Sequence, residues 1–158
     1  MKLIVDADAS PKKEEIIHAA QNYGLEVILV SSISHYSVKE LPEGVSRVWV
    51  DTGIDLADFK IMQLASARDI VFTNDYGLAS MLLPKKCRII HHEGYEYTES
   101  LMQQLIDSRH LSAKQRRTSK RSRVKSMDPF AGETRIPFEE LLEQVITEQL
   151  EKRNEASE

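Results

Sequence analysis

Short apolar runs alternate with amphipathic segments over the first 110 residues, and this alternation limits the fold more than any other feature. The runs are compact and rich in Val, Ile and Leu, which is typical of buried β-strands. The segments between them carry apolar residues at helical spacing. Alternating strands and helices favour a mostly parallel sheet. The predicted strands are 2–6, 25–31, 45–51, 69–73 and 87–91, and the predicted helices are 10–23, 54–67, 76–83 and 99–109.

The composition changes at about Ser112. Residues 114–125 contain seven basic side chains and no acidic one. Residues 136–152 then carry Phe138, Leu141 and Val145 on one side of an amphipathic helix. We therefore divide the chain into an α/β core at 1–111, a basic flexible arm at 112–135 and a C-terminal helix at 136–152.

Length and composition are those of one globular domain. The chain has 158 residues, of which 41% are hydrophobic and 29% charged. A net charge of −4 argues against a composition devoted to nucleic-acid binding. The single Cys87 cannot form an internal disulfide, which fits a reducing compartment. Neither a signal-peptide pattern nor a membrane-spanning run is visible, so we expect a cytoplasmic protein without membrane contact. The oligomeric state stays open, and a homo-oligomer is compatible with the sequence.

Aspartates gather where predicted strands end and the following helices begin. In a parallel sheet these positions share one edge, which is where open α/β sheets bind ligands. Asp55 and Asp58 are three residues apart and so share one side of a helix. After the first strand, Ser10 is predicted to cap a helix and Pro11 to occupy its first position. The candidate carboxylates are Asp6, Asp8, Asp55, Asp58 and Asp75, with Asp51 as a further candidate.

Carboxylates that converge on one edge repel one another unless a cation intervenes. Oxygen ligands without Cys or His suit Mg²⁺ or Mn²⁺ rather than zinc. Such a cluster activates water and stabilises charge on a phosphate. The sequence therefore predicts metal-assisted phosphodiester hydrolysis. The simpler interpretation is that some of these aspartates, Asp55 above all, only cap helices or face solvent.

Three segments together resemble the bacterial YaiI/YqxD family of uncharacterised proteins. They are Val-Asp6-Ala-Asp8-Ala-Ser10-Pro11, Asp55-Leu-Ala-Asp58 and Thr73-Asn-Asp75. The resemblance covers residues 2–110 and continues into the Lys114-Gln-Arg-Arg stretch. The family is related to the PIN-domain nucleases. The resemblance therefore implies a PIN-like fold with a parallel sheet, an acidic pocket at the strand ends and metal-dependent ribonuclease activity.

The resemblance also implies a role for each residue of these segments. It makes Asp6 the ligand at the end of the first strand, Asp58 the helix aspartate and Asp75 the ligand of the Thr-x-Asp segment. It makes Thr73 a hydrogen-bonding support. Asp8 and Asp55 are further carboxylates of the family pattern, serving as supporting ligands or bases.

The chain departs from these patterns at two points. Ser10 stands where the family usually has a cysteine. PIN nucleases also supply a glutamate from a helical insertion between the second and third strands. Here residues 32–44 offer only Glu40 and Glu43, and neither is expected to reach the site.

Two other chemistries fit parts of the sequence. Asp6-Ala-Asp8-Ala-Ser10 matches the start of haloacid-dehalogenase-like phosphatases, in which Asp6 would be the nucleophile and Asp8 the general acid/base. A receiver-like domain phosphorylated on Asp51 is a weaker fit. A non-enzymatic alternative is a module that keeps the acidic pocket and uses the basic arm to bind RNA or a protein.

The basic arm is predicted to track a phosphate backbone, although such runs also occur as solvated segments. Aromatic residues are not interleaved with it, so any RNA binding should tolerate sequence changes. His91 and His92 are adjacent on a predicted strand, face opposite sides and are interpreted as structural. The candidate RNA-contacting residues are Lys114, Arg116, Arg117, Lys120, Arg121 and Arg123.

Overall fold

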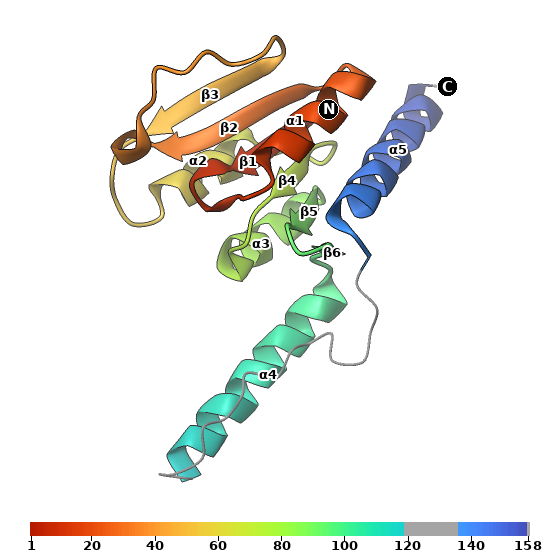
Figure 1. The fold of residues 1–158 in the computed structure, drawn as a ribbon. Coiled ribbons are helices and arrows are strands. Elements are labelled where there is room, and N and C mark those ends of the chain that lie inside the picture. The colour runs from red at the N-terminus through yellow and green to blue at the C-terminus, as the bar shows by residue number, and fades with distance from the viewer. Residues whose placement is uncertain (119–135, 158) are drawn as a thin grey trace.

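The computed structural model describes residues 1–118 and 136–157, and the side chains of 1–108 and 136–156. It is an α/β fold in which helices cover both faces of one sheet (Figure 1). The strands are β1 (Lys2–Asp6), β2 (Glu26–Ser32), β3 (Val45–Val50), β4 (Ile70–Phe72), β5 (Arg88–His91) and β6 (Tyr95–Glu96). The helices are α1 (Lys13–Tyr23), α2 (Leu56–Leu64), α3 (Tyr76–Leu82), α4 (Glu99–Thr118) and α5 (Phe138–Ser157).

The strand order is β3-β2-β1-β4-β5-β6, and all neighbours are parallel except β5 and β6. The chain first builds outward from β1 through β2 to β3. It then crosses to the other side of β1 to form β4. The order therefore reverses between β1 and β4. In open α/β sheets the crevice at this reversal, outside the carboxyl ends of the strands, is the usual ligand site.

Alternation along the strands divides the core between the two faces of the sheet. Leu3 and Val5 pack with α1 and α5, whereas Ile4 packs with α2 and α3. Asp6 is two residues beyond Ile4, so it faces the α2 side. The alternation of side chains along β1 thus places Asp6 on the same face of the sheet as α2 and α3.

The predicted fold class is confirmed, with one addition to the sheet. The two-residue strand β6 pairs antiparallel with β5 and makes the sheet six-stranded. A strand of only two residues shows no periodicity in the sequence, so β6 could not be predicted. The C-terminal helix is also confirmed, and Val145 and Ile146 on it are fully buried.

The predicted start of the first helix is wrong. Residues 7–9 form a short 3₁₀ turn after β1, and α1 begins only at Lys13. Ser10 ends that turn, and its Oγ accepts a hydrogen bond from the Lys12 backbone N–H (3.3 Å) instead of capping α1. Pro11 precedes the helix rather than occupying its first turn. A serine side chain bonds to the backbone two residues on as readily as it caps a helix, and here the turn prevails.

Helix α4 is longer than predicted. It extends to Thr118 and so includes residues 112–118, at which the sequence predicted the beginning of the arm. Residues 110–118 contain neither Gly nor Pro and are rich in good helix formers, which explains the extension. The rest of the predicted arm, 119–135, lies outside the described residues. No helix in the described ranges 1–118 and 136–157 is both long and apolar enough to span a membrane.

Candidate active site at the strand-order reversal

Asp6 and the Thr73–Asp75 segment lie on either side of the reversal between β1 and β4. Asp6 is the last residue of β1, and Thr73 follows β4 directly. The pairing of Val5 with Phe72 brings these two strand ends level. Two segments separated by 67 positions in the sequence are therefore adjacent in the sheet.

The Thr73 hydroxyl joins the two aspartates. Its Oγ1 donates a hydrogen bond to Asp6 Oδ2 (3.1 Å) and accepts one from the Asp75 backbone N–H (3.1 Å). Asp75 in turn caps α3, because its Oδ1 accepts from the N–H groups of Gly77 (2.8 Å) and Leu78 (3.4 Å). Asp6 and Thr73 are both buried. Thr73 thus makes hydrogen bonds to both aspartates of this edge.

Asp58 reaches the same edge from the first turn of α2. Desolvation, followed by the charges of Asp75, Asp6 and Asp55, raises its pKa from 3.8 to about 6. Burial is also the main reason that the pKa of Asp6 is raised, and the charges of Asp8 and Asp75 raise it further. The hydrogen bond from Thr73 opposes that change. The carboxylates of Asp6, Asp58 and Asp75 therefore act on one another electrostatically.

Because the pKa of Asp58 is higher in the folded protein than its ordinary 3.8, the folded state binds this proton more tightly. The resulting stabilisation is complete below pH 3.8 and is lost as the pH rises through about 6. We expect this group to lower the free energy of unfolding by about 1 kcal/mol across that interval, after allowing for the screening of a half-buried carboxylate. Urea unfolding of metal-free protein as a function of pH measures it. Asp58→Asn should flatten this part of the profile, and an unchanged profile in that variant would contradict the assignment.

Asp55 and Asp8 hold the outer positions of the cluster. Asp55 precedes α2 in the left-handed conformation (φ 62°), and its side chain makes no capping hydrogen bond. Asp55 is thus at the N-cap position and faces solvent, as the simpler interpretation expected, but without a side-chain cap. Its hydrogen bond with Asp58 helps to raise the pKa of Asp58. Asp8 Oδ2 accepts from the Ser32 N–H (2.7 Å), and Oδ1 lies 3.4 Å from His35 Nδ1. Asp8 is thus directed toward the end of β2.

Three other acidic residues lie away from this cluster. Asp51 follows β3, two strands from β1, and is exposed. Glu40 shares a pocket with α1, and Glu43 lies where β3 begins, at the opposite edge of the sheet. The predicted helix 54–67 begins too early: α2 begins only at Leu56, and Ile54 is 90% exposed.

Asn74 and His92 were not predicted as site residues. Asn74 Nδ2 donates to the Ala9 carbonyl oxygen (2.8 Å), and Asn74 Oδ1 is hydrogen-bonded to His92 Nδ1. The turn after β1 is thereby tied to the end of β5. In the sequence, only the position of Asn74 between Thr73 and Asp75 indicated that it could belong to the site. Its partners Ala9 and His92 are distant in sequence, so these contacts could not be predicted.

The expectation that His91 and His92 face opposite sides is wrong. Their rings stack 4.4 Å apart, because β5 ends at His91 and strand alternation does not extend to His92. His91 also stacks on Tyr95 of β6 with centroids 4.5 Å apart. The two histidines thus belong to an aromatic cluster beside Asn74.

The donor set of this edge suits a hard divalent cation. Asp6, Asp58 and Asp75 offer carboxylate oxygens, and the raised pKa values of Asp6 and Asp58 indicate that the negative charge there lacks compensation. Within residues 1–108 and 136–156, no three acidic, His or Cys side chains lie close enough together to share an ion. Side-chain rotation toward an ion is therefore part of any such binding.

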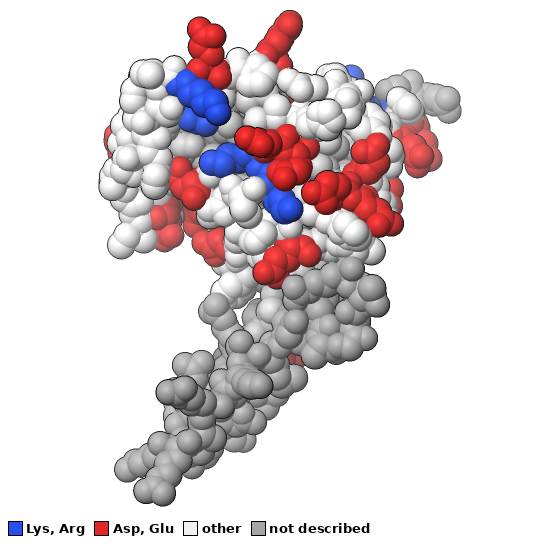
Figure 2. Space-filling view, in the orientation of Figure 1, with Lys and Arg blue, Asp and Glu red and all other residues white. Residues whose placement is uncertain are grey.

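Acidic side chains predominate on the face that carries α1 and α5, with a smaller number of basic side chains among them (Figure 2). Lys114, Arg116 and Arg117 belong to α4. Lys120, Arg121 and Arg123, which complete the predicted RNA contact, lie outside the described residues.

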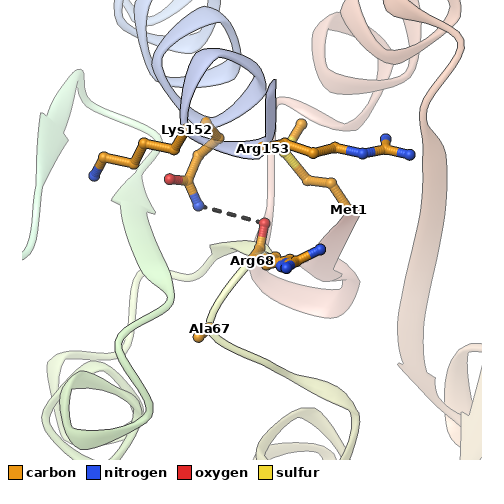
Figure 3. Close-up of a pocket in the computed structure, with 6 residues that line it drawn as sticks. Met1, Ala67, Arg68, Lys152 and Arg153 are labelled. Atoms are coloured by element: carbon orange, nitrogen blue, oxygen red, sulfur yellow. Dashed lines mark hydrogen bonds between the residues drawn. The ribbon is translucent and has the colours of Figure 1, made fainter. Parts of the chain in front are cut away.

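A cavity of about 180 Å³ lies at the edge of the sheet opposite the carboxylates. Gln149 of α5 donates a hydrogen bond to the Arg68 carbonyl oxygen there (3.3 Å), and Lys152 and Arg153 point away on either side (Figure 3). The described residues that line it include no carboxylate. This cavity is therefore separate from the candidate active site.

Comparison with known proteins agrees with the resemblance in the motifs. The family model described as "Uncharacterized BCR, YaiI/YqxD family" matches residues 4–148. A UPF0178 protein of Bacillus cereus (strain G9842) is 47% identical over 146 residues, which are 92% of this chain and 99% of the relative. A UPF0178 protein of Oceanobacillus iheyensis is 48% identical over 147 residues, or 93% and 99% of the two chains. No solved structure matches the chain. The chain belongs to the YaiI/YqxD family of uncharacterised bacterial proteins.

Proposed function

We propose that this chain is a nuclease-like hydrolase that uses Mg²⁺ or Mn²⁺ to cleave RNA phosphodiesters. The observation that carries the proposal is the Asp6–Thr73–Asp75 arrangement at the strand-order reversal, with Asp58 coupled to it electrostatically. A purely structural edge gains nothing from Asp6 and Asp58, whose pKa values are raised first by burial and then by neighbouring carboxylates. A phosphate-cleaving site needs them to hold a cation.

Some residues of the site would bind the metal ion, and others position those ligands. Asp6, Asp58 and Asp75 would hold the ion, and Thr73 orients the first and the last of them. A bound ion supplies a Lewis acid that activates water and neutralises charge developing on the phosphate. Burial and the neighbouring carboxylates raise the pKa of Asp58 to about 6 in the metal-free protein, and a cation held there would compensate its charge. Asp8 and Asp55 supply further negative charge at the rim.

The basic run at 114–125 would supply the contact with RNA. Its lysines and arginines would pair with backbone phosphates, so binding should weaken steeply with added salt. The lack of interleaved aromatic residues predicts little preference for base sequence. RNA rather than DNA is the expected substrate by the resemblance to PIN nucleases.

The phosphatase alternative has weaker support from the geometry. Its nucleophile would be Asp6, but Asp6 is only 9% exposed and its Oδ2 is engaged by Thr73. Its general acid/base would be Asp8, whose oxygens are directed to Ser32 and His35. A nucleophile must be open to attack a phosphate, whereas a metal ligand is normally held by neighbouring donors.

Purified protein is expected to cleave labelled single-stranded RNA when Mn²⁺ is added, and EDTA should stop the reaction. Excess Mn²⁺ added after EDTA should restore it. Gel analysis of the products over time measures the rate. A phosphomonoester assayed in parallel tests the phosphatase alternative, and hydrolysis of that ester without RNA cleavage would contradict our proposal. Metal-independent RNA binding without cleavage would favour the non-catalytic module.

A further inference from the structure

The β3 edge of the sheet is open and apolar. Strand β3 is six residues long, Val-Ser-Arg-Val-Trp-Val, and it has a neighbour on one side only (Figure 1). The other edge is formed by β6, which has only two residues. Exposed edges in monomeric proteins are normally short or interrupted by charged residues, proline or a bulge. β3 contains no proline and pairs with β2 without a bulge, and its one charged side chain, Arg47, stacks on Trp49. The strand is therefore suited to pair with another strand.

The neighbouring loop packs against side chains of the sheet. Its residues 37–42 share a pocket with Lys13, Ile17 and Leu29, and the ring of Tyr36 lies 5.0 Å from that of Trp49. Among the described residues, no backbone hydrogen bond outside the pairing with β2 reaches residues 46–50. The Val27 N–H bonds to the Gly44 carbonyl oxygen. The parallel pattern therefore directs the N–H and C=O groups of Arg47 and Trp49 outward.

Arg47 and Asp51 give this edge charges of both signs. The Arg47 guanidinium stacks over the Trp49 ring (5.0 Å to the centroid), yet its Nε is buried and has no hydrogen-bond partner among the described residues. Asp51 follows the strand directly and is exposed. The residues at positions 47 and 51 are equidistant from Trp49. If a second β3 strand pairs antiparallel with this one, centred on Trp49, position 47 of each strand lies opposite position 51 of the other.

Apolar side chains flank the edge on the α2 side. Phe59 of α2 is 63% exposed, and it lines an open groove with Leu56, Val48 and Val50. Exposed aromatic and aliphatic groups beside an unpaired strand form the kind of patch that marks an interaction site. A partner strand carrying its own α2 helix would cover this groove.

We propose that a second copy of this chain pairs with the β3 edge, antiparallel and centred on Trp49, to form a two-fold symmetric dimer with one continuous sheet. Arg47 then lies opposite the partner's Asp51, and Asp51 opposite the partner's Arg47. Of the two-fold registers that this edge permits, the one centred on Trp49 sets opposite charges against each other, whereas centring on Arg47 sets two arginines together. Self-complementarity of this kind is what a two-fold interface requires.

Sedimentation equilibrium of the full chain tests this arrangement. Wild-type protein is expected to have twice the monomer mass of 18.0 kDa. Arg47→Asp and Asp51→Arg should each weaken the dimer at least about tenfold, because each sets like charges opposite one another. The double variant Arg47→Asp/Asp51→Arg should restore it, since the opposite charges are exchanged. Circular dichroism checks that each variant is folded.

A second pair of variants tests the apolar part of the surface. Phe59→Ser should shift the equilibrium toward monomer, whereas Met81→Ser, at an exposed methionine of α3, should leave it unchanged. Monomeric wild-type protein overturns the proposal. A dimer that survives both single charge reversals, or a double variant that stays monomeric, overturns it as well.

Discussion

Replacing Asp6 with asparagine is expected to lower Mn²⁺-dependent RNA cleavage more than about 100-fold, since residues that merely orient a ligand already contribute about 10–100-fold. The same change should raise the melting temperature of the metal-free protein. Asparagine keeps the shape of the side chain and still accepts the hydrogen bond from Thr73. It removes a charge whose burial, together with the charges of Asp8 and Asp75, raises the pKa of Asp6.

Thermal unfolding in EDTA and in Mn²⁺, together with the cleavage assay, measures both effects. Wild-type protein should be stabilised by Mn²⁺, and the variant should lose most of that gain. RNA binding should persist, which separates loss of chemistry from loss of substrate. Cleavage at the wild-type rate would show that Asp6 does not hold the ion. A lower melting temperature in EDTA would show that its charge is compensated in the metal-free protein.

Asp69 provides the matched control, because it is a buried aspartate at the opposite edge of the sheet. Its carboxylate accepts hydrogen bonds from the N–H groups of Lys2 and Ser66 and from the Ser66 hydroxyl. Asp69→Asn directs an amide donor at groups that are already donors. We expect a loss of about 1–3 kcal/mol of stability and no change in the stabilisation by Mn²⁺. Asp6→Asn should therefore stabilise the metal-free protein, whereas Asp69→Asn should destabilise it. This difference distinguishes a cluster of metal ligands from buried aspartates in general.

Ile146→Ala is expected to lower the free energy of unfolding by about 2–5 kcal/mol, the usual range for truncating a buried isoleucine. Ile146 is fully buried on α5, in the cluster that includes Leu3, Val5 and Phe72 of the sheet. The truncation leaves a cavity between α5 and the strands. Urea unfolding followed by circular dichroism measures the change.

Two further variants calibrate this result. Ile146→Val should cost about 0.5–1.5 kcal/mol, because it removes a single methylene group. Glu151→Ala, at an exposed position of the same helix, should change stability by less than about 0.5 kcal/mol. If the alanine variant at Ile146 were as stable as the Glu151 variant, α5 would not be part of the cooperative core.

Local sequence patterns were sufficient to predict most of the chain's helices and strands and the positions of its key aspartates. The runs at 2–6 and 45–51 were identified because β-strands bury compact apolar segments. Asp6 and Asp75 were expected at one edge because each follows a predicted strand in a parallel sheet. These inferences need only neighbouring residues and the rule that parallel strands share a direction. Family membership, too, was expected from three short segments.

Contacts between distant segments were beyond the reach of those patterns. Crossing from β3 to β4 places β4 beside β1 and so brings Thr73 within hydrogen-bonding distance of Asp6. The same strand order makes β3 the outermost strand, so Asp51 lies two strands away from Asp6. Both residues nevertheless follow the end of a strand. Neither result follows from local spacing, because strand order is set by the packing of helices on both faces.

The sequence by itself therefore determined the α/β class, the family and the set of carboxylates at the strand ends. Only the tertiary structure decided which of them act together. It coupled Asp6, Asp58 and Asp75, turned Asp8 toward β2 and used Ser10 in a turn instead of a helix cap. The physical reason is that periodicity and turn chemistry act over a few residues. Burial, hydrogen bonding and charge–charge interactions instead depend on which segments the whole fold brings together.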